Sequence, residues 1–306
     1  MKPLPDCKYR ITPSILNSFH RYLNPDYEGF WWQDEAGGWH TNYNEDTGEY
    51  HFTPSKVDDM ALKEFIDTLN RVESISEAAC KGTALNEVVD WAVSGVKPNA
   101  EKVVTDSSRS EDKLSVAIKK SRDDDGPFLD DNVFRFNFSR SWVASIAEYF
   151  KGSLCQVEVH APLDTKYGRT ELYGYIDYWN ANRVYDLKTT KRYTFGDHSH
   201  GWQKHVYPYC LVKSGMIDEI QDFEYTIYKW TGGTRYQPLL AGEQYKEVYT
   251  FDYGYSEMML RKQCERLIEF LEEHRDEITD LKIFGGEYHS EEDRIKAEMK
   301  AKQLAL

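Results

Sequence analysis

Two aspartates and one lysine within residues 173–190 have the types and the spacing for metal-dependent chemistry. Asp177 and Asp186 are nine positions apart, and Lys188 follows two residues after the second aspartate. Residues two apart on a strand point to the same face of a sheet, so Asp186 and Lys188 are expected to share a face. Two carboxylates and an amine on one face are the minimum set that binds a divalent cation and activates a water molecule.

The segment that carries these residues has the pattern of a β-hairpin. Aromatic and β-branched residues, which favour strands, precede the turn-forming sequence Asn180-Ala181-Asn182. After the turn, Val184, Tyr185 and Leu187 form the return strand. A hairpin with this turn would bring Asp177 beside Asp186.

The order of these residues resembles the signature of the PD-(D/E)xK nucleases. Residues 174–177 (GYID) resemble the GxxD half of that signature, and residues 186–190 (DLKTT) resemble its DxKT half. Gln203 and Tyr207 are similar to the QxxxY motif of the RecB-like branch, which includes the phage lambda exonuclease type. The resemblance covers about residues 81–231.

The resemblance implies an α/β fold with a PD-(D/E)xK, restriction-endonuclease-like core. A small mixed sheet would carry the hairpin, and helices around Leu85 and Gln203 would flank it. In the family, two carboxylates and one backbone carbonyl bind one or two Mg²⁺ or Mn²⁺ ions. In this chain the matching groups are Asp177, Asp186 and the carbonyl of Leu187.

The resemblance also implies roles for three further side chains. Lys188 would orient or deprotonate the attacking water and stabilise the oxyanion, and the sequence leaves both roles open. Gln203 and Tyr207 are four residues apart and share one face of a helix. They would hold Lys188 or a DNA phosphate.

A helix upstream resembles the first motif of the family, which reads GxxxH or GxxxE and ends in a metal ligand. Here Gly82 begins the motif, and the ligand position is occupied by Asn86. An amide oxygen is a weaker ligand for a hard cation than a carboxylate. Glu87 is the adjacent carboxylate, but one residue is about 100° further round a helix. Asn86 and Glu87 are therefore alternative ligands, and Glu87 could equally be a solvated surface residue.

The charge balance argues against a protein that coats DNA by bulk electrostatics. The net charge is −14 and the isoelectric point is about 5.2, whereas phosphate binding favours positive surface. Residues 182–205 are locally basic, and within them Lys191, Arg192 and Lys204 are candidate contacts to nucleic acid. The alternative is a solvated loop with ordinary charges.

The cysteines and the N-terminus bear on compartment and cofactors. The five cysteines are dispersed and form no CxxC pair, which is typical of reduced thiols in a cytosol-like compartment. Some relatives hold an iron–sulfur cluster with four cysteines, but the spacing here does not match, so no cluster is expected. No signal peptide or membrane span is apparent, so a cytoplasmic location is expected.

The chain divides into three predicted regions. Residues 1–73 form a helical, aromatic-rich extension, residues 74–254 the core with a loop insertion at about 94–132, and residues 255–306 C-terminal helices. Helices are predicted from Thr12, from Ser55, and over 74–93, 114–118, 142–150, 200–212, 255–280 and 290–306. Strands outside the hairpin are predicted over 154–159, 223–230 and 245–251.

Residues 27–53 mix aromatic side chains with Gly, Asn and Asp and predict a hairpin or an aromatic insertion. Trp31, Trp32, Trp39 and Tyr43 could stack on unpaired bases. The alternative is that they pack a small unit that lacks aliphatic side chains.

The expected function is a metal-dependent nuclease that hydrolyses DNA phosphodiester bonds. The resemblance favours an exonuclease of phage or prophage-type recombination, with a single-strand annealing or recombination protein as partner. One alternative is a binding module for DNA ends or proteins with weakened metal chemistry, which Asn86 and the acidic composition favour. A hydrolase of another class is a further alternative, although the sequence has no HExxH, GxSxG or phosphate-loop motif. The oligomeric state does not follow from the sequence.

Overall fold

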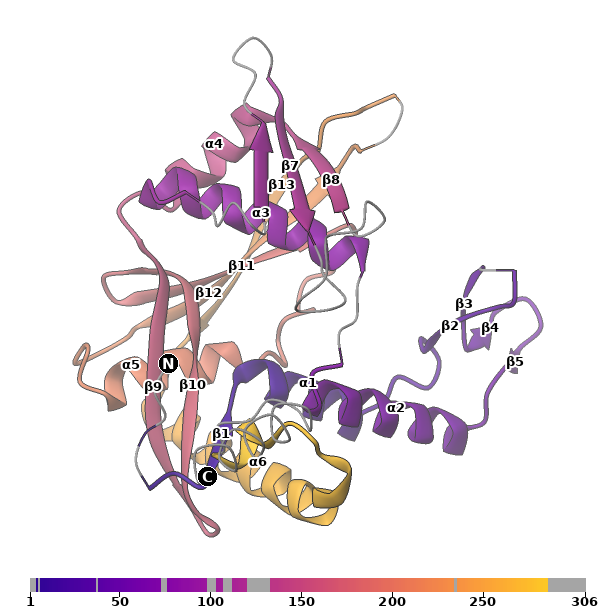
Figure 1. The fold of residues 1–306 in the computed structure, drawn as a ribbon, viewed down its shortest axis with the longest axis vertical. Helices are drawn as coiled ribbons and strands as arrows, with labels where there is room; N and C mark the ends of the chain where they lie inside the picture. Colours follow the sequence, from indigo (N-terminus) through magenta and orange to yellow (C-terminus); the bar gives the residue numbers. More distant parts are fainter. Residues whose placement is uncertain are drawn as a thin grey trace, which may run out of the picture.

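A six-stranded mixed sheet forms the centre of the fold (Figure 1). The computed structural model describes residues 4, 6–36, 38–72, 76–97, 103–106, 112–119, 133–233 and 236–285. The long strand β10 pairs with β9 along one edge and with both β1 and β11 along the other, and the sheet continues through β12 to β13. Its strands are β1 (Tyr9–Ile11), β9 (Leu154–Thr165), β10 (Gly168–Asn180), β11 (Arg183–Thr190), β12 (Asp222–Thr231) and β13 (Ala241–Thr250).

The predicted hairpin is confirmed as β10 and β11. The two strands are antiparallel, with Tyr178 opposite Tyr185 and Asn180 opposite Arg183. Ala181 turns the chain with a positive φ of 50°. Because side chains directly opposite in an antiparallel pair point to the same face, this register directs Asp177 and Asp186 to a common face.

Helices cover both faces of the central sheet. On one face α1 (Pro13–Leu23), α2 (Pro54–Leu69), α5 (Gln203–Lys213) and α6 (Tyr253–Glu273) share a core with Ile176, Val184 and Phe223. On the other face, α3 (Glu77–Ser94) and α4 (Arg140–Tyr149) pack with Tyr178, Leu187 and Tyr228. The fold is therefore α/β, with the hairpin enclosed between two helical layers.

The predicted loop over residues 94–132, with its short helix at 114–118, is wrong. The described part contains β6 (Val103–Asp106) and β7 (Leu114–Lys119), which form a three-stranded antiparallel sheet with β8 (Val133–Phe138). Leu114, Val116 and Ile118 are buried against α3 and α4. Their spacing of two fits a strand, and the pairing with β8 is a tertiary contact that local sequence does not reveal.

The predicted helices are otherwise present, with shifted ends. Thr12 caps α1 as expected, since its Oγ1 accepts a hydrogen bond from the Ile15 N–H at 3.3 Å. The second helix begins at Pro54, one residue before the predicted Ser55, and Thr53 caps it. The C-terminal helix ends at Glu273 and is followed by the short 3-10 helices η2 (Arg275–Glu277) and η3 (Leu281–Phe284). The predicted helix over residues 290–306 lies outside the described residues.

The aromatic-rich extension forms two small hairpins beyond the N-terminal end of α2 (Figure 1). These are β2 (Trp31–Gln33) with β3 (Trp39–Thr41), and β4 (Tyr43–Asn44) with β5 (Glu49–Tyr50). The ring of Trp32 stacks on His51 with a centroid distance of 3.6 Å, so it packs the extension itself. Trp31 is 55% exposed and remains a candidate for stacking, whereas the side chain of Trp39 lies outside the described residues.

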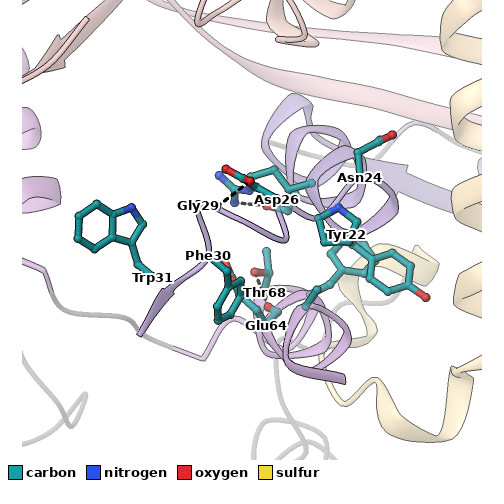
Figure 2. A pocket seen from close by; sticks show the side chains of 13 residues that line it. Tyr22, Asn24, Asp26, Gly29, Phe30, Trp31, Glu64 and Thr68 are labelled. Atoms are coloured by element: carbon teal, nitrogen blue, oxygen red, sulfur yellow. Dashed lines mark hydrogen bonds between the residues drawn. The ribbon is translucent and has the colours of Figure 1, made fainter. Parts of the chain in front are cut away.

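A pocket of about 350 Å³ lies where the extension meets α1 and α2. Figure 2 shows Tyr22 and Phe30 in its lining, while the ring of Trp31 stands apart from the other labelled side chains. The Asp26 carboxylate is hydrogen-bonded within its own loop, because its Oδ1 accepts a hydrogen bond from the Gly29 N–H at 2.9 Å. The lining thus combines aromatic side chains with polar ones such as Glu64 and Thr68.

Among the described helices, none has the length and apolar character needed to cross a membrane. Among the described residues, no cysteine takes part in a disulfide.

Candidate metal and phosphate site

The hairpin brings together the three residues that the sequence singled out. The Leu187 N–H donates a hydrogen bond to Asp177 Oδ2 at 2.9 Å, which fixes Asp177 against the opposite strand. The Lys188 Nζ lies 2.6 Å from Asp186 Oδ2. Asp186 is 4% exposed, whereas the side chain of Lys188 is 30% exposed. The arrangement is a carboxylate pair with one ammonium at its edge.

Burial and the charge of Asp186 raise the pKa of Asp177 to about 8, although Lys188 and the Leu187 N–H act in the opposite direction. Burial alone would lower the pKa of Lys188, but the Asp186 and Asp177 carboxylates outweigh it and the pKa lies above its ordinary value. At neutral pH, Lys188 is therefore an ammonium and Asp177 favours its protonated form. A cation placed beside Asp177 would favour the ionised form instead.

The backbone is irregular directly opposite Asp177. Strands β9 and β10 pair on both sides of this point, with Ile176 opposite Val157 and Tyr178 opposite Cys155, but the pairing is interrupted at Asp177 and Gln156. Gln156 has a positive φ of 50°. Two clefts, of about 570 and 520 Å³, meet here, since both are lined by Asp177 and Gln156.

The first cleft contains the candidate ligands of α3. Asn86 and Glu87 both line it together with Asp177. The Oδ1 of Asn86 is buried and has no hydrogen-bond partner among the described residues, which leaves an oxygen donor available. The helix approaches β11 closely at Gly82, where a Cβ would lie 3.1 Å from Thr189 Oγ1. The absence of a side chain at Gly82 thus allows α3 to lie close to the hairpin.

Asp90 is a fourth acidic residue near this cleft that the sequence reasoning missed. It lies one helical turn after Asn86 and lines the same cleft as Asp177. Its two oxygens accept hydrogen bonds from Tyr178 Oη at 2.5 Å and from Gln156 Nε2 at 2.9 Å. Burial raises the pKa of Asp90 to about 6. The signal in the sequence was the spacing of four from Asn86, which places both residues on one helix face.

Gln203 and Tyr207 lie on α5 as predicted, but their side chains make different contacts. The Oε1 of Gln203 accepts hydrogen bonds from Asn17 Nδ2 at 3.0 Å and from Tyr225 Oη at 3.2 Å. The Lys188 Nζ lies 5.8 Å from the centroid of the Tyr225 ring. Gln203 therefore supports the tyrosine beneath Lys188, and no direct bond from Gln203 to Lys188 appears in the described part. Tyr207 lines the second cleft with Asp177.

Three cations that the sequence reasoning missed line this second cleft. They are Arg10, Arg71 and Lys282. The Nε of Arg10 lies 2.6 Å from Glu171 Oε2, but within the described structure its buried Nη2 has no partner. Burial, Arg71 and Arg10 all lower the pKa of Lys282, which shows that the cations are close together. They come from β1 and from segments distant in sequence, so no local motif could have indicated them.

The basic residues of the stretch 182–205 lie at different places in the fold. Lys191 and Arg192 are exposed directly after β11. Arg183 lies at the other end of that strand and pairs with Asp222 at 2.8 Å. Lys204 contacts the Ser199 carbonyl and lies 4.1 Å from the centroid of the Tyr249 ring. Of these basic residues, Arg183 is thus ion-paired at one end of β11, whereas Lys191 and Arg192 are exposed after its other end.

The donors present fit a hard divalent cation. No group of three or more His, Cys, Asp or Glu side chains is placed to hold a metal together within the part that the structure describes. Asp177, Asp186 and the free Oδ1 of Asn86 are nonetheless all oxygen donors, and a cation such as Mg²⁺ completes its shell with water and substrate oxygens.

No protein family and no curated protein matches the sequence. Part of the chain is similar to the crystal structure of SSO0001, with 12% sequence identity and a TM-score of 0.26. That similarity covers 37% of this chain and 50% of the other, so this chain spans about half of that protein's length. A TM-score this low carries no argument about fold family or function.

Proposed function

We propose that this chain is a Mg²⁺- or Mn²⁺-dependent deoxyribonuclease of the PD-(D/E)xK, RecB-like type. The observation that carries the proposal is the hairpin geometry: Asp177 faces Asp186 across the turn, and Lys188 lies 2.6 Å from Asp186. The resemblance of the motifs to that family supports the same conclusion, and an exonuclease role in phage or prophage-type recombination rests on the resemblance alone.

The metal would be held by Asp177 and Asp186, with the Asn86 side chain and the Leu187 carbonyl as further oxygen donors. Once bound, a divalent cation lowers the pKa of a water molecule and neutralises charge on the phosphate. Lys188 has a raised pKa, so it acts as a charged hydrogen-bond donor. Of the two roles that the sequence left open, stabilising the oxyanion is therefore favoured over deprotonating water.

The cations of the second cleft suit a phosphate-containing substrate. Arg10, Arg71 and Lys282 line the cleft that ends at Asp177. A nucleic-acid strand in this cleft would place its phosphates against these side chains and one phosphodiester beside Asp177. Arg10 pairs with Glu171 and Arg71 pairs with Asp280, which also lines the cleft, so the groups left to bind a phosphate are Lys282 and the unpartnered Nη2 of Arg10.

The test is cleavage of 5′-phosphorylated linear DNA and of closed circular DNA by the full chain with Mg²⁺ or Mn²⁺. We expect the linear substrate to be degraded and the circle to survive. Asp186→Asn should abolish both cleavage and calorimetric Mn²⁺ binding, because the neutral amide loses the charge attraction. If neither the linear nor the circular DNA were cleaved at saturating metal, the proposal would be contradicted.

A binding module is the second candidate, and two observations favour it. Asn86 stands where the family has a stronger ligand, and Lys188 already compensates Asp186 without a metal. Such a module would bind DNA without cutting it and would show no saturable Mn²⁺ binding. Calorimetry combined with the cleavage assay therefore separates the two candidates.

A further inference from the structure

A separate cleft of about 370 Å³ lies between α1, α5 and α6 and has no acidic residue in its lining. The whole chain has 52 acidic and 38 basic residues, so a lining without any carboxylate is unusual for this protein. Three cations line the cleft: Lys204, Lys262 and Arg266. The cleft is thus a positive region on an acidic protein.

Two of these cations, Lys262 and Arg266, form no close ion pair among the described residues, although the charge of Arg266 helps to lower the pKa of Glu269. Lys262 and Arg266 are one turn apart on α6, and both side chains are exposed. Neither takes part in an ion pair in the described portion of the chain. Like charges four residues apart on a helix repel each other. An anion between them would relieve this repulsion.

Two buried donors in the lining also have no acceptor. Trp202 is 7% exposed and Gln263 is 5% exposed. Neither the Trp202 Nε1 nor the Gln263 Nε2 has a hydrogen-bond partner among the residues described. Because buried donors without an acceptor are costly, this pair indicates an acceptor that the protein itself does not provide.

The other residues that line this cleft add further hydrogen-bond donors. His20 and His200 stack with a centroid distance of 5.1 Å. Burial, His200 and Arg266 lower the pKa of His20, which reflects the positive surroundings. The N-terminus of α5, which begins at Gln203 without a side-chain cap, contributes partial positive charge to the same place.

We propose that this cleft is a phosphate-binding subsite for the nucleic-acid strand, separate from the Asp177 centre. The assignment to a strand rests on the proposed nuclease function. Gln203 and Lys204 are neighbours on α5, and Gln203 supports the Tyr225 ring beneath Lys188 while Lys204 lines the cleft. A strand leaving the hairpin could therefore present its next phosphates here. Arg266 offers the planar guanidinium that binds phosphate oxygens in pairs.

The experiment measures binding of a labelled single-stranded oligonucleotide to the full chain by fluorescence anisotropy, in chelator, over a range of salt concentrations. Lys262→Ala and Arg266→Ala should each weaken binding and lower the salt slope by about 0.7 for each phosphate that the variant no longer binds. The matched control is Arg261→Ala. Arg261 precedes Lys262 but bonds to the Asp164 carbonyl at 3.0 Å and lies 3.8 Å from Glu257, outside the cleft. The control should keep the parental slope.

Equal slopes for the parent, Lys262→Ala and Arg266→Ala would overturn the proposal, as would a parent that binds no oligonucleotide. A second arm titrates inorganic phosphate by calorimetry. Saturable phosphate binding without oligonucleotide binding would assign the cleft to a small anion and overturn the strand assignment. Because chelator prevents metal-dependent cleavage, an inactive protein whose oligonucleotide binding depends on Lys262 and Arg266 would retain the subsite and lose only the proposed nuclease function.

Discussion

Gly174 lies against the ring of Tyr207, so closely that a Cβ at residue 174 would be 2.9 Å from Tyr207 Cε1. The two residues belong to separate predicted motifs, GxxD on β10 and QxxxY on α5. The glycine thus makes room for the tyrosine, and the contact sets α5 against the hairpin at the level of Asp177. The spacing of residues within each motif is a local feature of the sequence. The fit of Gly174 against Tyr207 is a tertiary contact.

Gly174→Ala should destabilise the protein, because a Cβ at that distance must displace the Tyr207 ring. Overpacking of a buried contact costs about 1–3 kcal/mol, measured as a decrease in the free energy of unfolding by urea titration. The control is Gly254→Ala in α6, where the nearest atom to a Cβ is 3.6 Å away. That variant should be neutral or slightly stabilised, since Ala favours a helix over Gly. Equal stability of Gly174→Ala and the parent would show that Tyr207 is not held by this contact.

Asp177 should make stability depend on pH in the absence of divalent cations. Its folded pKa of about 8 lies above the ordinary aspartate value, so the folded state retains a proton that the unfolded chain releases. The stability from this group is complete below a pH of about 4 and is lost as the pH rises to about 8. Asp177→Asn should therefore gain stability relative to the parent over that range, by more than ~1 kcal/mol at the upper end.

Thermal melting of both proteins across this pH range, in chelator, measures the difference. Saturating Mn²⁺ should reverse the order at the upper end, because the cation stabilises the ionised parent and has one carboxylate fewer to bind in the variant. A constant difference between the two melting temperatures at all pH values would contradict the raised pKa.

Lys188→Ala should lower the rate of DNA cleavage by about 10²–10⁴-fold, because the charged donor beside Asp186 is removed. Oligonucleotide binding in chelator should change little. The matched control is Lys191→Ala, an exposed lysine just after the same strand. It should keep the rate at saturating DNA and lower the salt slope of binding by about one unit. Cleavage by Lys188→Ala at the parental rate would make Lys188 a surface ion-pair partner only.

Asn86→Glu should raise the affinity for Mn²⁺, since a carboxylate replaces an amide oxygen that has no partner in the described structure. Glu87→Ala should leave the affinity nearly unchanged and serves as the comparison. Calorimetric titration measures both. The opposite result, with Glu87→Ala abolishing metal binding and Asn86→Glu having no effect, would assign the ligand position to Glu87.

The sequence alone predicted the elements whose signals are local. The hairpin around Asn180-Ala181-Asn182 follows from turn chemistry and from apolar strands on both sides, and the α/β fold follows from their alternation with helices such as α1 and α5. The placement of Asp186 and Lys188 on one face needs only the twofold period of a strand. These features depend on neighbours in the chain, which a sequence displays directly.

Only the tertiary structure decided the rest. The spacing of Leu114, Val116 and Ile118 fits a strand, but the pairing of β7 with β6 and β8 is a tertiary contact. Asp90 reaches the Asp177 cleft through the packing of α3, and Arg10 reaches it from β1, which pairs with β10. Lys204 and Arg266 line the same cleft because α5 and α6 pack against each other. Burial and the charge of Asp186 raise the pKa of Asp177, and the charge of Lys188 lowers it. These effects depend on distances in the folded structure and not on distances along the sequence.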